Sequence, residues 1–138
     1  LAAAKATLTV LRETDALVRL QQQGEALWQR LWSVITQREL PVELYGDYAR
    51  MTLKWRDVPG VVTAPELYTL WLQETIKRGI LCNVPLFSMC CWDATIVDAI
   101  MHAACLALQA IYEVVHEQRP IDDALEVPVI GTLLNVRA

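Results

Sequence analysis

The chain has 138 residues, enough for one domain with a core of its own. Hydrophobic residues make up 54% of it, against about 45–50% in typical soluble domains, and the mean hydropathy is +0.28. The 16 acidic and 12 basic residues give a net charge of −4. They form neither a basic stripe nor a block of like charge, which argues against nucleic-acid binding and against a disordered charged tail.

The apolar excess has two interpretations, a membrane span or a surface covered by a partner. A spanning helix needs about 20 mostly apolar residues. The best candidate, Ile96 to Val115, is interrupted by polar side chains (Asp98, His102, Gln109 and Glu113). We therefore expect no membrane segment, and favour a partner surface over a merely well-filled core.

The first third of the chain predicts two helices. Residues 1 to 11 are alanine-rich and start without a methionine or a secretory signal, so we expect a cut within a longer protein. Thr14 or Asp15 then offers a cap for a second helix that runs to about Gln37. Gly24 lies inside this helix and predicts close packing there. The apolar stripe of the helix consists of Leu27, Leu31, Val34 and Ile35, widened by Trp28 and Trp32.

Two strands follow Pro41, which ends the helical region. We expect strands at 42–45 and 50–55 with a turn at Gly46-Asp47. In the second strand apolar and polar residues alternate, which predicts a sheet with one covered face and one more polar face.

Thr63 and Glu66 match a capping box that opens a third helix, closed by Gly79. Two short strands are then predicted, at 80–83 and 86–91, on either side of Val84-Pro85.

Asp93 is predicted to cap a long helix that runs to about Glu117 and is stopped by Pro120. The remaining residues allow either short strands, at 125–127 and 129–130, or an extended tail. The predicted buried side of the long helix consists of Ile96, Ile100, Ala103, Ala107, Ile111 and Val114. These elements predict an α+β domain, with helices packed on one face of a small, mainly antiparallel sheet. We divide the chain into this domain, residues 1–119, and a C-terminal extension, residues 120–138.

The residues capable of chemistry are few. His102 and Cys105 have a spacing that permits metal binding, and His102 could pair with the Cys91 thiol, but ordinary core packing is the favoured interpretation of all of them. No phosphate-binding loop and no self-sufficient active site is present. We therefore predict no catalytic, cofactor-binding or metal-binding residue in this chain. The four cysteines (Cys82, Cys90, Cys91 and Cys105) lie in apolar contexts, which is typical of a reducing cytoplasm.

The stretch Leu70 to Ile100 resembles the C-terminal small domain of class III pyridoxal-phosphate (PLP) aminotransferases, in particular the glutamate-1-semialdehyde aminomutase-like branch. The most similar piece is Glu74 to Ile80, ETIKRGI, followed by a strand ending in Ser88. Cys91 stands where the family has a histidine, which indicates an outlying relative. The resemblance extends from Leu1 to about Glu117 and includes the segments 1–8, 23–25, 41–46 and 50–55.

This resemblance implies a fold type I enzyme whose large domain carries the lysine that binds PLP as a Schiff base. Lys5, Lys54 and Lys77 occupy none of the positions expected for that lysine, so it is expected upstream. The implied partners are the large domain of the same protein and a second copy in a cytoplasmic homodimer. The turn Asn83-Val84-Pro85 is the segment expected near the substrate, with a plain tight turn as the alternative. A stand-alone α+β interaction or dimerisation module, without catalysis, is the alternative function.

Overall fold

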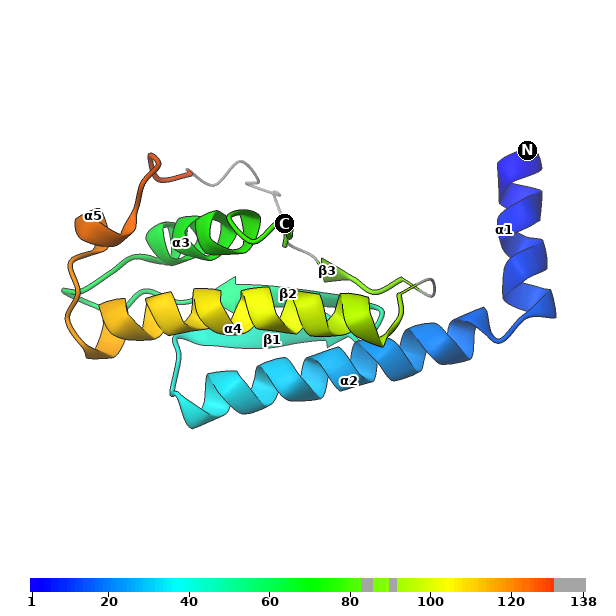
Figure 1. Ribbon diagram of the computed structural model, residues 1–138, viewed down its shortest axis with the longest axis horizontal. Coiled ribbons are helices and arrows are strands. Elements are labelled where there is room, and N and C mark those ends of the chain that lie inside the picture. The colour runs from blue at the N-terminus through cyan, green and yellow to red at the C-terminus, as the bar shows by residue number, and fades with distance from the viewer. Residues whose placement is uncertain (83–85, 90–91, 131–138) are drawn as a thin grey trace.

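The computed structural model describes residues 1–82, 86–89 and 92–130 (Figure 1). Its elements in chain order are α1 (Ala2–Glu13), α2 (Ala16–Gln37), β1 (Val42–Asp47), β2 (Arg50–Trp55), α3 (Ala64–Ile76), β3 (Leu86–Phe87), α4 (Ala94–His116) and α5 (Ile121–Ala124).

The strands form one antiparallel sheet in the order β1-β2-β3. The predicted turn at Gly46-Asp47 is wrong, because β1 continues to Asp47 and the hairpin turns at Tyr48-Ala49. The Asp47 carboxylate accepts a hydrogen bond from the Ala49 N–H at 2.9 Å, so the aspartate closes the turn with its side chain.

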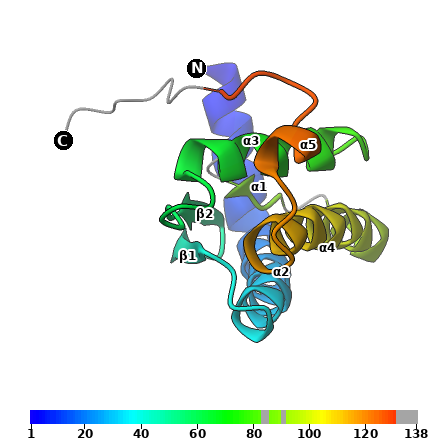
Figure 2. The same cartoon turned by 90° about the vertical axis from the view of Figure 1, so that its left-hand side faces the viewer.

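Three helices cover one side of this sheet, which confirms the predicted α+β class (Figure 2). α2 lies beside β1, α3 lies beside β2, and α4 lies across from the sheet between these two helices. Met51 and Leu53 point from β2 into the core, where Trp71 of α3 is fully buried. The opposite face of the sheet exposes polar side chains, among them Glu43, Arg50 and Lys54, together with Tyr45.

Side-chain caps begin α3 and α4 as the sequence predicts. The Thr63 N–H donates to the Glu66 carboxylate at 2.7 Å, and the Asp93 carboxylate accepts from the Ile96 N–H at 2.9 Å. Each cap satisfies a backbone N–H that has no partner inside the helix. After α3, Gly79 adopts a left-handed conformation with φ of +77°, which lets the chain reverse direction at little cost.

The second predicted pair of strands is mostly absent from the described residues. Residues 80 to 82 form no strand, and the strand predicted at 86–91 is reduced to β3. Residues 80 to 82 form no strand because α3 makes hydrogen bonds to their backbone. The Ile80 N–H donates to the Thr75 carbonyl at 3.0 Å, and Trp71 Nε1 donates to the Cys82 carbonyl at 3.0 Å.

α4 is the central helix of the core. Ile96 was predicted to be buried but is 40% exposed, and its neighbour Val97 is buried instead. One residue is about 100° of helix rotation, so the true buried stripe starts one position later. By length and composition alone, α4 is apolar enough to cross a membrane. The core helices of soluble proteins share this property, and 44% of the most apolar 18-residue stretch of α4 is buried inside the structure.

One group of exposed apolar residues lies at the N-terminal end of the chain. α1 buries none of its residues and stands away from the helices and sheet (Figure 1). Leu8, Val10, Leu17 and Val18 on α1 and the start of α2 are each about half exposed or more. Part of the exposed apolar surface therefore lies here, and the rest is spread over the described chain between Trp32 and Val129.

Residues 121–130 pack against α3 and form no strand. The Gln73 side chain accepts from the Glu126 N–H at 2.7 Å and donates to the Ala124 carbonyl at 2.9 Å. Thr69 accepts from the Ile130 N–H at 2.9 Å. Since Thr69 and Gln73 are one helical turn apart, α3 presents a row of side-chain partners to this backbone.

Candidate functional site

The first half of α2 contacts the hairpin turn at Gly24. A Cβ at Gly24 would lie 2.1 Å from the Tyr48 carbonyl oxygen, so only glycine fits. The same carbonyl accepts a hydrogen bond from Ser88 Oγ at 3.0 Å, and the Ser88 N–H donates to the Ala49 carbonyl at 3.1 Å. Three segments that are distant in sequence are thus fixed at one point, and the close packing predicted at Gly24 is confirmed.

Gln23 extends this junction toward α4. Its side-chain amide donates to the Trp92 carbonyl, while its Oε1 is buried without a hydrogen-bond partner among the described residues. On the other side of Gly24, Trp28 packs edge-on against Tyr48 with ring centroids 5.8 Å apart.

The predicted substrate-proximal residues Asn83, Val84 and Pro85 lie outside the described residues. The residues that flank them are firmly held: Cys82 is buried and bound through its carbonyl to Trp71, and Leu86 pairs with Met51 of β2. The described residues on either side of 83–85 are therefore attached to α3 and to the sheet.

The Cys82 thiol does not have the environment of a nucleophile. Burial raises the pKa of Cys82 to about 11, partly offset by a hydrogen bond from Thr75, so this thiol stays protonated at neutral pH. Cys105 is half-buried in α4, and His102 is exposed on the same helix. Cys91, the thiol that the sequence allowed as a partner of His102, lies outside the described residues, as does Cys90.

Neither a metal site nor a PLP site is assembled from the residues in the described part of the chain. No group of three His, Cys, Asp or Glu side chains there could hold a metal ion. PLP requires an enclosed lysine for its Schiff base. Lys5 and Lys54 are exposed, and Lys77 is engaged in ion pairs with Glu74 and Glu126. The described residues thus do not fit the cofactor.

The strongest charge cluster surrounds Glu74 near the end of α3. Its carboxylate lies 2.8 Å from Arg78 Nη1 and 2.9 Å from Lys77 Nζ. Burial by itself would raise the pKa of Glu74, but hydrogen bonds from Arg78, Gln73 and Lys77 outweigh it and lower the pKa from 4.5 to about 2. Lys77 also binds Glu126 at 2.5 Å, so the cluster supports the C-terminal segment on α3.

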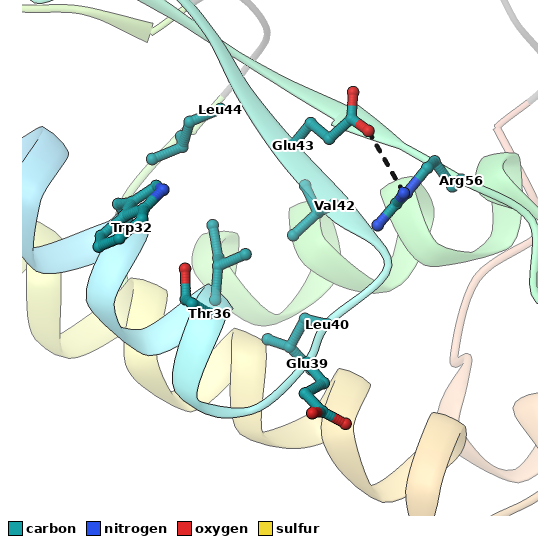
Figure 3. A pocket seen from close by; sticks show the side chains of 9 residues that line it. Trp32, Thr36, Glu39, Leu40, Val42, Glu43, Leu44 and Arg56 are labelled. Carbon is teal, nitrogen blue, oxygen red and sulfur yellow. Dashed lines mark ion pairs between the residues drawn. The ribbon is translucent and has the colours of Figure 1, made fainter.

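A hollow of about 390 Å³ lies between the end of α2 and β1 (Figure 3). Its buried apolar part consists of Ile35, Leu40 and Val42, and Trp32 lies at its α2 side with 53% of its surface exposed. Glu43 and Arg56 form an ion pair of 3.3 Å at its edge. The sequence placed Trp32 on the apolar stripe of α2 and did not indicate this hollow, which exists because the chain reverses after α2 through Glu39 with φ of +49°.

The fold is similar to part of one solved structure. That structure is the PLP internal aldimine form of the FumI protein from Sphingopyxis sp. MTA144, which matches with a TM-score of 0.71 and 21% sequence identity over 90% of this chain. This chain spans 30% of the length of FumI. Neither a protein-family model nor a curated protein sequence matches the chain.

Proposed function

We propose that the chain is the C-terminal domain of a PLP-dependent aminotransferase or aminomutase of the class III kind, similar to glutamate-1-semialdehyde aminomutase. The single observation that carries the proposal is the fold shared with FumI over 90% of the chain. The motifs around Glu74 to Ile80 and Ser88 support the same family. The Schiff-base lysine and most PLP contacts then belong to a large domain upstream, in a cytoplasmic homodimeric parent.

In this function the domain shapes and closes the substrate site. The turn Asn83-Val84-Pro85 is its proposed contact with the substrate region. Its attachment at Cys82 and Leu86 to α3 and the sheet supports this role, because a positioning loop needs a rigid base. The exposed apolar residues of α1 and the start of α2, such as Leu8 and Leu17, are the proposed contact with the large domain.

The alternative is a stand-alone interaction or dimerisation module, which the same exposed apolar residues on α1 and α2 also favour. It requires neither PLP nor an upstream large domain.

The test is to express the whole parent reading frame and look for the absorbance of a PLP–lysine Schiff base. Borohydride reduction followed by peptide mapping then locates the modified lysine. We expect it outside these 138 residues, and we expect the 138-residue chain alone to hold no stoichiometric PLP. A pyridoxyl group on Lys5, Lys54 or Lys77 contradicts the proposal, and a parent frame without a PLP-binding lysine supports the interaction module.

A further inference from the structure

The outer edge of β1 has backbone groups that point away from the sheet. The Arg56 N–H donates to the Pro41 carbonyl at 2.9 Å, and Val42 lies opposite Trp55. Because hydrogen-bonded pairs alternate along an antiparallel ladder, Glu43 is bonded to β2 in the same way as Pro41. The N–H and C=O of Leu44 therefore face outward.

No described segment pairs with this edge. β1 is the terminal strand of the sheet, and Leu44 forms no hydrogen bond outside the β1–β2 ladder among the residues that the structure describes. The Val42 N–H is bound locally by the Leu40 carbonyl at 2.8 Å. An unpaired strand edge is a template for an additional strand.

The hollow between α2 and β1 adjoins this edge. Leu44 and Trp32 lie at the same end of it (Figure 3). Side chains of an added strand alternate between the two faces of the sheet. Those that share the face of Val42 and Leu44 would enter the hollow and cover Trp32, which is otherwise half exposed.

The charges at this edge favour a basic segment. Glu43 points to the open face of the sheet, and its cationic neighbours, Lys54 opposite it and Arg56, both lie on the β2 side. Glu39 at the rim of the hollow forms no ion pair among the described residues. A basic side chain on the added strand next to Glu43 would share that carboxylate with Arg56.

We propose that the outer edge of β1 and the adjoining hollow bind an extended segment of a protein partner as an added strand. The segment has the pattern apolar–basic–apolar. Its apolar side chains cover Trp32 and Leu44, and its basic side chain faces Glu43. This inference does not depend on the PLP-related function.

The test titrates the ¹⁵N-labelled 138-residue chain with the blocked peptide acetyl-Thr-Val-Lys-Val-Thr-amide. We expect saturable NMR shifts at the Leu44 amide and the Trp32 indole N–H. A peptide with glutamate in place of lysine should bind about threefold more weakly, the typical weight of a cross-strand charge pair. A peptide N-methylated at both valines should not bind, since it cannot form the backbone ladder.

Variants identify the docking surface. Trp32→Ala should weaken peptide binding about tenfold and Glu43→Gln about threefold. Gln29→Ala and Glu25→Gln, on exposed positions of the same helix, should leave it unchanged. No saturable shift at Leu44, or equal binding of the N-methylated peptide, overturns the proposal. A Leu44 shift that depends on protein concentration without peptide also overturns it, because the edge is then occupied by a second copy.

Discussion

The α-carbon of Gly24 in α2 packs directly against the carbonyl oxygen of Tyr48 in the hairpin turn. That carbonyl also accepts the Ser88 hydroxyl at 3.0 Å. Because Gly24 has no side chain, α2 lies close to the hairpin turn, and this contact sets the distance between the helix and the sheet. It also sets the position of Ser88, which follows β3.

Gly24→Ala should destabilise the domain by about 1–3 kcal/mol, the usual cost of overpacking. In an unconstrained helix the same change would stabilise by about 1 kcal/mol, so the sign of the effect is informative. Chemical denaturation monitored by circular dichroism measures it. Gln22→Ala, on an exposed position of the same helix, should be close to neutral. A stabilised Gly24→Ala variant would show that the contact with Tyr48 is not close.

Gln73→Leu should cost about 2 kcal/mol or more, since it leaves the Glu126 N–H and the Ala124 carbonyl without their partner. The loss should be local as well as global, so hydrogen exchange at the Glu126 amide should become much faster than at the amides of α4. Gln21→Leu, on the exposed side of α2, is the matched control. Unchanged protection of Glu126 would refute the role of Gln73.

Stability should fall on acidification from pH 4.5 toward pH 2 because of Glu74. Its pKa is lowered from 4.5 to about 2 in the folded chain, so below pH 4.5 the unfolded chain binds a proton that the folded chain does not. The stabilisation, roughly 1–3 kcal/mol after solvent screening of the partly exposed partners, is present above pH 4.5 and is lost as the pH falls.

Denaturation curves across this pH range, compared between the native chain and Glu74→Gln, measure the effect. The variant should be less stable at neutral pH and should show a shallower pH dependence between 4.5 and 2. Glu25→Gln, which changes an exposed carboxylate, should retain the native slope. Parallel curves for Glu74→Gln and the native chain would remove Glu74 as the cause.

Cys82 should resist alkylation in the folded chain. Its pKa of about 11 and its 2% exposure leave little accessible thiolate at neutral pH. Iodoacetamide labelling followed by peptide mapping should show Cys82 modified at least about tenfold more slowly than the half-buried Cys105. In denaturant the two rates should converge. Equal labelling in the folded state would mean that the region around Cys82 opens readily.

The sequence predicted the elements whose signals are local. The capping box at Thr63 and Glu66, the cap at Asp93 and the pairing of β1 with β2 each depend on neighbours within a few residues. All were found, although the turn between the strands lies at 48–49 and not at 46–47. The close packing at Gly24 could also be predicted, although its partner Tyr48 is distant in sequence, because a glycine inside a helix lowers helix stability and therefore indicates a special packing role.

The errors arose where a distant partner decides the structure. Residues 80 to 82 have the composition of a strand, but their backbone is bound by Trp71 and Thr75 of α3. The hollow beside β1 depends on the left-handed turn at Glu39 and on the angle between α2 and the sheet. Neither leaves a local pattern in the sequence. The proposed substrate-proximal turn at 83–85 stays a prediction.

The row of side chains on α3 that holds residues 121–130 has a consequence for the order of folding. Thr69 and Gln73 contact backbone that lies 51 to 61 positions later in the sequence. These contacts require a formed α3, because Thr69 and Gln73 lie side by side only when the segment is helical. We therefore expect the C-terminal segment to dock last, onto a helix that is already packed, and to be the first part of the domain to detach when it unfolds.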